Sequence, residues 1–255
     1  MSHILENRFL EAIRQQLQGL SDKVTGDFSK ENFDSEMAAL QGDPVYEKFS
    51  FNRAEYVLIR FMGRISISIG RRLGEIYDKV PRFVAAARFN LTPEQVAPKI
   101  DGLELDISLN LELLSPQDQA HVKETYKRFV GRNLNEGGLG IEIRYNFNPN
   151  DSSRLRKDVE MGEKLSQIGL TPIYLVFSTI SPRNDAISRL RNNGWTFLIG
   201  DDAIQFITVL LGLEIHTILD KPEIKAEIKA IVDTIMDNLV ESYSFKQVSQ
   251  KKTVR

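Results

Sequence analysis

The stretch that decides the fold is Leu139-Gly140-Ile141-Glu142-Ile143-Arg144-Tyr145-Asn146-Phe147, which follows Gly137-Gly138. Apolar residues occupy every second position in it. A period of two is typical of a β-strand, because successive side chains point to opposite faces of the sheet. We therefore expect Ile143 to face the core, while Glu142 and Arg144 project together from the polar face.

A second stretch with the same period lies earlier in the chain, over residues 103–111. Its apolar positions alternate with polar ones that include Asp106, so the Asp106 side chain should project opposite to the neighbouring leucines. A helical pattern over 116–130 separates the two predicted strands. If the strands pair, Asp106 and Glu142 lie side by side at one edge of the sheet.

Beyond Pro149 helical and strand patterns alternate. The sequence predicts a helix over 151–168 with Asp151 or Ser152 as N-cap, strands over 173–177 and 195–199, and helices over 184–192 and from Gly200 to about Leu211. Strand–helix–strand order implies right-handed crossovers and parallel pairing. The predicted fold is therefore of the α/β (α+β) class, with a mixed β-sheet flanked by helices.

The remaining segments set the expected domain limits. Residues 1–52 have the pattern of short amphipathic helices and form the expected N-terminal helical region, residues 53–243 form the expected core domain, and the polar residues 244–255 form a flexible tail. A last amphipathic helix is predicted over 222–240. Its apolar side fits packing against the domain better than the alternative, a dimer interface.

The predicted helix over 53–79 carries an arginine stripe, with an apolar face opposite that includes Met62. The stripe consists of Arg53, Arg60, Arg64 and Arg71. Two interpretations of it stay open: a solvated helix face, or a row of contacts to phosphates. The alternation over 65–69 could belong to a strand instead, but the wider window favours a helix.

Composition excludes several classes of site. The chain has no cysteine, which excludes disulfides, thiolate zinc sites and a cysteine nucleophile. No apolar stretch reaches the roughly 18 residues of a membrane span, and the N-terminus lacks the pattern of a secretory signal, so we expect no membrane partner and a cytoplasmic location. The sequence contains no Gly-x-x-x-x-Gly-Lys-Ser/Thr loop, which argues against ATP as a partner. A net charge of −2 gives no sign of nucleic-acid binding.

Two carboxylates at one sheet edge would form a site for a hard cation. Together with the backbone carbonyl of Ile143, Asp106 and Glu142 offer only oxygen ligands, which suit Mg²⁺. A bound Mg²⁺ polarises a phosphate oxygen and lowers the pKa of water, and the neighbouring Arg144 would stabilise negative charge developing at phosphorus. These parts suffice for phosphodiester hydrolysis. The alternative interpretation is the ordinary polar face of a half-buried sheet.

The order of these elements resembles the PD-(D/E)XK nuclease core of type II restriction endonucleases over residues 53–213. The stretch Pro98–Ile107 resembles the first acidic motif of that superfamily, and Glu142-Ile143-Arg144 resembles its (D/E)XK motif. Residues 70–77 resemble the first core helix of many restriction enzymes, and residues 195–203 resemble the ApaLI-like group.

The resemblance implies a sequence-specific double-stranded DNA endonuclease that uses Mg²⁺, leaves 5′-phosphate ends and acts as a homodimer on a palindromic site. It makes Asp106 the central metal ligand and Glu142 the second. Asp101, at the strand entrance, competes for the first role, and Glu75 is an auxiliary acid.

Arg144 departs from the family pattern, because it stands where the superfamily has a lysine. An arginine, with a pKa above about 12, does not readily act as a general base. Three explanations stay open. Arg144 acts electrostatically, which we favour; Lys157 on the following helix reaches into the site; or the chain is an inactivated variant.

Three basic residues, Arg154, Arg156 and Lys157, cluster at the start of the predicted helix over 151–168. Added cations and a helix N-terminus favour phosphate binding, so we expect these residues, together with Arg64 and Arg71, to contact DNA. Three alternatives remain: a noncatalytic DNA-binding module on a nuclease-like fold, a structure-specific repair nuclease, or an unrelated α/β interaction protein without DNA affinity.

Overall fold

The computed structural model describes residues 3–147, 152–180, 184–212 and 214–249. The chain divides into two compact units. We call Met1–Phe9 with Gly74–Ile218 the sheet unit, and Leu10–Leu73 with Leu219–Arg255 the helical unit. The division falls inside helix α4 (Ala54–Phe89), so it differs from the expected limit at residue 52. A boundary within a continuous helix has no linker composition that a sequence could reveal.

The sheet unit is built on a four-stranded sheet in the order β3-β4-β5-β6. Its strands are β3 (Ile107–Asn110), β4 (Gly138–Arg144), β5 (Leu170–Val176) and β6 (Thr196–Ile199). β3 pairs with β4 antiparallel, while β4 with β5 and β5 with β6 pair parallel. The predicted mixed sheet is confirmed, and so is the predicted pairing of the two alternating segments.

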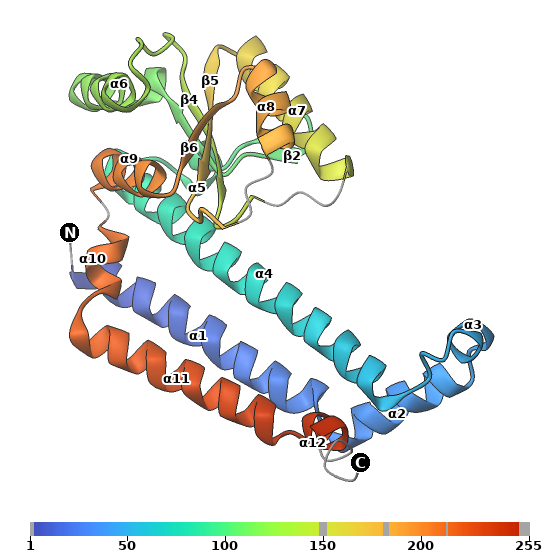
Figure 1. The fold of residues 1–255 in the computed structure, drawn as a ribbon. Helices are drawn as coiled ribbons and strands as arrows, with labels where there is room; N and C mark the ends of the chain where they lie inside the picture. The colour runs from blue at the N-terminus through green and yellow to red at the C-terminus, as the bar shows by residue number, and fades with distance from the viewer. Residues whose placement is uncertain (1–2, 148–151, 181–183, 213, 250–255) are drawn as a thin grey trace. The chain divides into compact units, whose positions relative to one another are not determined.

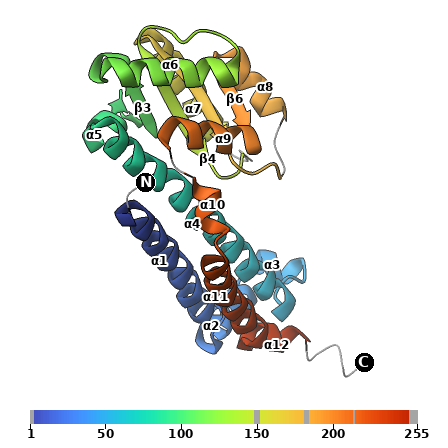
Figure 2. The same ribbon diagram turned by 90° about the vertical axis from the view of Figure 1, so that its left-hand side faces the viewer.

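Helices cover both faces of this sheet, as predicted. α7 (Ser152–Gln167) and α8 (Asn184–Asn192) lie on one face, and α6 (Pro116–Val130) and α9 (Asp201–Leu211) lie on the other (Figures 1 and 2). Because both faces are covered, polar side chains of the sheet such as Ser108 and Glu142 become buried, and so does Asp106, which directly precedes β3. The half-buried sheet with a wet polar face is therefore not what forms. The Asp151 part of the N-cap prediction lies outside the described residues.

The predicted strand over 103–111 is broken into pieces. The described chain forms β1 (Lys99–Ile100), β2 (Leu103–Glu104), then β3, and the 3₁₀ helix η1 (Leu111–Leu113). Asp101 and Gly102 make the β1–β2 turn with φ values of 48° and 84°. The backbone N–H of Leu105 then donates to the Pro98 carbonyl at 3.1 Å instead of joining the main sheet. This interruption leaves the Asp106 side chain free to bond to β4.

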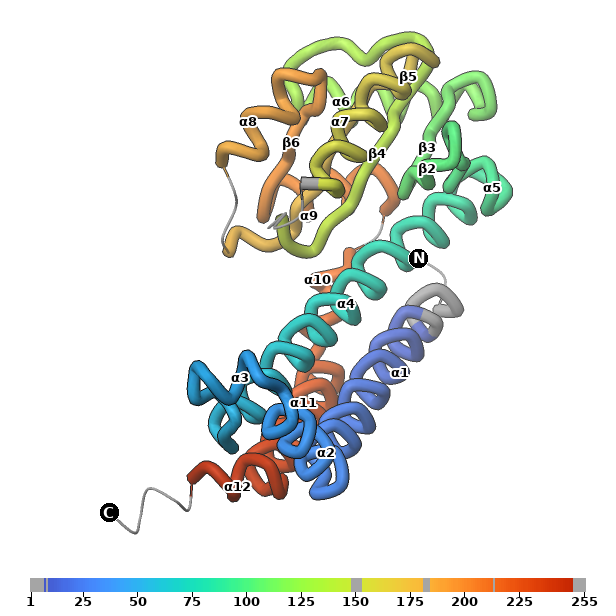
Figure 3. Tube along the Cα trace, turned by 90° about the vertical axis from the view of Figure 1, so that its right-hand side faces the viewer, coloured from blue at the N-terminus to red at the C-terminus, as the bar shows by residue number. Residues whose placement is uncertain are grey.

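Glycines allow α7 to lie close to the sheet. A Cβ at Gly140 on β4 would come within 2.6 Å of the Leu165 side chain, and one at Gly162 within 2.4 Å of the Trp195 indole nitrogen. The same indole nitrogen donates to the Asp158 carbonyl at 2.8 Å. These contacts hold the C-terminal half of α7 close to the sheet. Figure 3 shows the backbone of this unit from the side on which α7 lies.

Short helices complete the sheet unit, and the rest of the chain forms the helical unit. α5 (Pro93–Val96) and α10 (Ile215–Leu219) are the short helices. The helical unit contains most of α1 (His3–Asp27), α2 (Lys30–Gln41), α3 (Pro44–Lys48), the first half of α4, α11 (Pro222–Glu241) and α12 (Tyr243–Ser249). Ile235 and Leu239 of α11 are buried in the core of this unit, so the helix packs within the chain, but it belongs to the helical unit and not to the sheet-bearing domain over 53–243 to which it was assigned.

The C-terminal segment differs from the expected flexible tail. Residues 243–249 form α12, and the Ser244 hydroxyl is buried and donates to the Phe28 carbonyl at 3.1 Å. The Tyr243 ring packs edge-on against Phe33, with ring centroids 5.6 Å apart. An aromatic contact directly before the polar stretch and a buried hydroxyl within it therefore hold this end in place, and residues 250–255 lie outside the described part of the chain.

The first half of α4 is helical, as the wider sequence window predicted. Its buried stripe consists of Val57, Phe61 and Ile65, whereas Met62, expected on the apolar face, is 42% exposed. The described helices include none with the length and apolar character needed to cross a membrane.

Candidate active site

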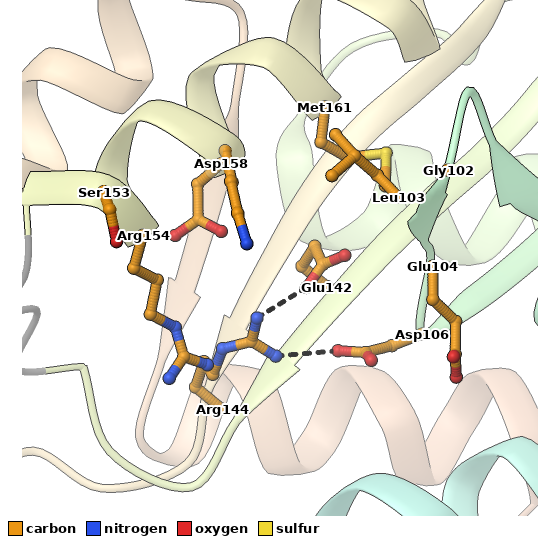
Figure 4. A pocket seen from close by; sticks show the side chains of 11 residues that line it. Gly102, Leu103, Glu104, Asp106, Glu142, Arg144, Ser153, Arg154, Asp158 and Met161 are labelled. Atoms are coloured by element: carbon orange, nitrogen blue, oxygen red, sulfur yellow. Dashed lines mark hydrogen bonds and ion pairs between the residues drawn. The ribbon is translucent and has the colours of Figure 1, made fainter.

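A cavity of about 460 Å³ opens in the sheet unit between the β1–β2 turn, the end of β4 and the N-terminal half of α7 (Figure 4). Its lining is mostly charged or polar. The lining residues are Gly102, Leu103, Glu104, Asp106, Glu142, Arg144, Ser153, Arg154, Lys157, Asp158 and Met161. Five of the residues predicted for the site therefore share one cavity: Asp106, Glu142, Arg144, Arg154 and Lys157.

Asp106 is held by donors on both of its oxygens. Its side chain is 6% exposed. Its Oδ2 accepts the backbone N–H of Ile143 at 2.7 Å, and its Oδ1 accepts an N–H of Arg82. Because Asp106 is hydrogen-bonded to Ile143, its carboxylate lies next to Glu142, the preceding residue of the same strand. The two predicted acids meet, although Asp106 lies in a bend between β2 and β3 and not within the predicted strand.

One guanidinium joins the parts of the predicted metal site. Arg144 Nη1 lies 3.0 Å from Asp106 Oδ2 and donates to the Ile143 carbonyl at 2.6 Å, while Nη2 lies 2.9 Å from Glu142 Oε2. Figure 4 shows Asp106 and Glu142 pointing toward this guanidinium from neighbouring segments. Arg144 therefore contacts both carboxylates and the carbonyl that were predicted to hold a cation.

Burial and nearby negative charge raise the pKa values of two acids in the cavity, Glu142 and Asp158. Burial, reinforced by the charge of Asp106, raises the pKa of Glu142 well above its usual range, and Arg144 offsets this only in part. Burial likewise raises the pKa of Asp158, against the effects of Arg144 and of the Tyr174 hydroxyl, which donates to it at 3.1 Å. The acids thus compete for the available positive charge.

Arg144 itself stays protonated. Burial lowers the pKa of Arg144, but the surrounding negative groups, Glu142 and Asp106 among them, outweigh burial and raise it above its ordinary value. A permanently charged guanidinium suits charge stabilisation and is a poor general base. Of the three explanations for this residue, the electrostatic one fits its contacts. Lys157 lines the same cavity with an exposed side chain and remains a second candidate.

Arg82 and Asp78 are site residues that the sequence analysis missed. Both lie on α4 in the sheet unit, four positions apart, with Arg82 Nε 2.6 Å from Asp78 Oδ1. Arg82 also donates to Glu104 and to Asp106, so it links three carboxylates. Burial and the charge of Asp106 raise the pKa of Asp78 to about 6, with Arg82 opposing. The spacing of an acid and a base at i and i+4 was the available signal.

Asp158 is the other missed residue, and it is buried at the cavity wall. The helical period offered a signal here as well. Arg154, Asp158, Met161 and Leu165 follow a spacing of three or four, so they share one face of α7, and Leu165 on that face is fully buried. An acid on the buried face of a helix indicates a partner nearby.

The two predicted auxiliary acids, Asp101 and Glu75, do not line the cavity that contains Glu142. Asp101 is 78% exposed in the β1–β2 turn and lies 3.4 Å from Lys164 Nζ, so Asp106, not Asp101, takes the position beside β4. The turn geometry carries Asp101 outward. Glu75 forms an ion pair with Lys79, one helical turn further along α4, and is not part of the cavity lining.

The remaining predicted DNA contacts lie in different surroundings. Arg156 is exposed on α7 but does not line the cavity. Arg64 belongs to the helical unit, where its Nη2 lies 2.8 Å from Glu36 Oε2; Arg60 pairs with the same glutamate. Arg71 is exposed in that unit. The arginine stripe is thus in part a paired helix face.

The donor set fits a hard divalent cation in its chemistry. Asp106, Glu142 and the Ile143 carbonyl are all oxygen donors, and all three contact the same guanidinium, the first and last through Nη1 and Glu142 through Nη2. Among the described residues no group of three or more His, Asp or Glu side chains could hold a metal ion. A cation here would therefore depend on two carboxylates and a carbonyl, with its other ligands from outside the chain.

Comparison of the chain with family models, with curated proteins and with solved structures finds no match in any of the three.

Proposed function

We propose that the chain is a Mg²⁺-dependent endonuclease that hydrolyses phosphodiester bonds of double-stranded DNA, on a core of the PD-(D/E)XK type. The observation that carries the proposal is the convergence of Asp106, Glu142 and the Ile143 carbonyl in a cavity whose lining also includes the exposed cations Arg154 and Lys157. Sequence-specific cleavage, 5′-phosphate ends and a homodimer are further parts of the same proposal.

The roles of the residues follow from their contacts. Asp106, Glu142 and the Ile143 carbonyl would hold Mg²⁺, which when bound polarises a phosphate oxygen and lowers the pKa of water. Arg82 and the Ile143 N–H orient Asp106 through separate oxygens. Arg144 supplies a permanent positive charge that would stabilise negative charge on the phosphate as it is attacked.

The entrance of the cavity suits a phosphate backbone. Arg154 and Lys157 are exposed and line it, and Ser153 lies in the first turn of the same helix. Backbone N–H groups at a helix N-terminus attract anions, and added cations strengthen that attraction. Binding of this kind is sequence-independent and sensitive to salt, so base recognition requires further contacts.

The direct test is digestion of a supercoiled plasmid of known sequence with Mg²⁺, followed by mapping of any ends. Asp106→Asn and Glu142→Gln are expected to lower the cleavage rate at least about a hundredfold, while DNA binding measured by fluorescence anisotropy in EDTA changes little. Asp101→Asn is the matched control, because it makes the same chemical change at an exposed carboxylate. Wild-type cleavage rates in Asp106→Asn would refute the assigned site.

A second candidate, a noncatalytic DNA-binding module on a nuclease-like fold, is favoured by one specific observation. Arg144 contacts each of the three oxygen groups that a cation would need. A module of this kind predicts that duplex DNA binds equally well with EDTA or Mg²⁺, and that no nicking occurs with Mg²⁺ or Mn²⁺. Cleavage with either ion excludes it.

A further inference from the structure

We propose that Arg144 is a resident counter-cation, which a divalent cation must displace before it can occupy the site. The inference deepens the proposed function and rests on it for the nature of the incoming ion. Its consequence is that the chain binds Mg²⁺ weakly by itself and more tightly once the guanidinium has another anion to bind.

The contacts of Arg144 exclude simultaneous occupation. Its two Nη atoms lie 2.6 to 3.0 Å from the Ile143 carbonyl, Asp106 Oδ2 and Glu142 Oε2. Mg²⁺ requires oxygens at about 2.0–2.1 Å in near-octahedral geometry. An ion between the same oxygens would meet the guanidinium at close range, and two cations in a buried site repel each other strongly. Arg144 must therefore leave at least part of this set.

Arg144, and not Arg82, is the cation that can be displaced. Arg82 is bound to three carboxylates, Asp78, Glu104 and Asp106, and holds Oδ1 of Asp106. Arg144 lines the cavity, which Arg82 does not, and its contact with Asp106 is on Oδ2. Among the described residues its Nε is buried without a hydrogen-bond partner. Release of Arg144 would thus free one oxygen of Asp106 while Arg82 keeps the other.

The cavity could hold an anion that binds the released guanidinium of Arg144. Arg154 and Lys157 line the same cavity, so with Arg144 they offer an entering anion three cations, against four carboxylates in the same lining, those of Glu104, Asp106, Glu142 and Asp158. A phosphodiester oxygen bound by Arg144 would replace the carboxylates that the guanidinium gave up. Mg²⁺ and phosphate should then each increase the affinity for the other. Mg²⁺ releases Arg144 from the carboxylates so that it can bind phosphate, and phosphate compensates Arg144 for the carboxylates that it leaves.

The first test uses Mg²⁺ alone, without DNA, and follows thermal unfolding and heat of binding. Arg144→Gln should bind Mg²⁺ at least about tenfold more tightly than wild type, because the competing charge is gone. Without Mg²⁺ the variant should unfold roughly 5 °C or more below wild type, since the buried Glu142 loses its ion pair with Arg144 and Asp106 loses one of its two arginine partners, and Mg²⁺ should restore part of that loss.

Two control variants accompany Arg144→Gln. Arg154→Gln removes the same charge from the same cavity without removing a contact to the three oxygens, so its Mg²⁺ affinity should stay near that of wild type. Asp106→Asn combined with Arg144→Gln should lose the gain in affinity. Equal Mg²⁺ affinity in wild type and Arg144→Gln, or a gain that survives Asp106→Asn, overturns the proposal.

A measurement on the wild type keeps the test decisive if Arg144→Gln does not fold. In a nitrogen-15 NMR titration with Mg²⁺, the side-chain signals of Arg144 should change with the same midpoint as the backbone amide of Ile143. A shift of Ile143 with unchanged Arg144 signals overturns the inference, as does the absence of both shifts at tens of millimolar Mg²⁺. Plasmid cleavage is measured separately. Displacement of Arg144 by Mg²⁺ without cleavage would refute only the proposed nuclease function. Cleavage without displacement of Arg144 would refute only this inference.

Discussion

At the scale of single residues, two arginines, Arg82 and Arg144, each form ion pairs with more than one carboxylate of the site. Asp106 takes one donor from Arg82, one from Arg144 and one from the Ile143 backbone. Arg82 in turn serves Asp78 and Glu104 as well. Removing one member of such a buried set leaves uncompensated charge, which costs more than the pair contributes when intact.

Arg82→Gln should therefore destabilise the protein by about 2–4 kcal/mol in urea unfolding. Asp78, Glu104 and Asp106 each lose the ion pair with Arg82. Arg144 is then the arginine that remains for both Asp106 and Glu142. Lys79→Gln, three positions earlier on α4, is the matched control, because its pair with Glu75 is at the surface and such pairs contribute roughly 0–1 kcal/mol. Equal losses in the two variants would contradict the assigned role of Arg82.

Asp78 provides a pH-dependent test. Its pKa is raised from 3.8 to about 6, first by burial and then by the charge of Asp106. The folded state thus holds the proton at a pH where the unfolded state has lost it, so the stability that Asp78 contributes is complete below about pH 4 and is lost as the pH rises through 6. Asp78→Asn cannot ionise. Its melting temperature relative to wild type should climb from pH 4 to pH 7, and a constant difference would contradict the raised pKa.

At the scale of elements, the packing of α7 on the sheet sets the depth of the cavity. Gly162→Ala would place a Cβ 2.4 Å from the Trp195 indole nitrogen, whose hydrogen bond to the Asp158 carbonyl locates the cavity wall. A rigid ring in a filled core cannot yield easily, so we expect a loss of about 1–3 kcal/mol in urea unfolding. Gly63→Ala, also in a helix but with open space around it, should instead stabilise by roughly 0.5–1 kcal/mol. The same sign of change in both variants would contradict this close packing.

Elements also show what the sequence could and could not predict. The bounds of α6 and α8 match the prediction, and Gly131, which ends α6 with a φ of 77°, is one local reason. The helix predicted over 53–79 instead continues to Phe89 through Pro81, a residue that usually ends a helix. That continuation carries Arg82 to Asp106. Glu142 lies in a strand with the predicted period, whereas Asp106 reaches it from a bend where a strand was predicted. Arg82 and Asp158 come from helices whose partners are fixed only by tertiary packing.

At the scale of the whole molecule, a net charge of −2 means that any DNA affinity must come from local groups of cations. Two such groups were predicted, and the structure gives them different surroundings. On α7, Arg154 and Lys157 are exposed at the cavity. In the helical unit, Arg64 already pairs with Glu36 at 2.8 Å. A cation that is paired within the protein releases fewer counter-ions from DNA, because part of its charge is already neutralised.

The salt dependence of DNA affinity should therefore separate the two groups. With a duplex in EDTA, Arg154→Gln and Lys157→Gln should each reduce the slope of log affinity against log salt by about one. Arg64→Gln should leave the slope nearly unchanged, since it removes a charge that Glu36 already balances. The measurement is fluorescence anisotropy across several salt concentrations. If Arg64→Gln lowers the slope as much as Arg154→Gln does, Arg64 contacts phosphate as Arg154 does, and the proposed difference between the two groups is wrong.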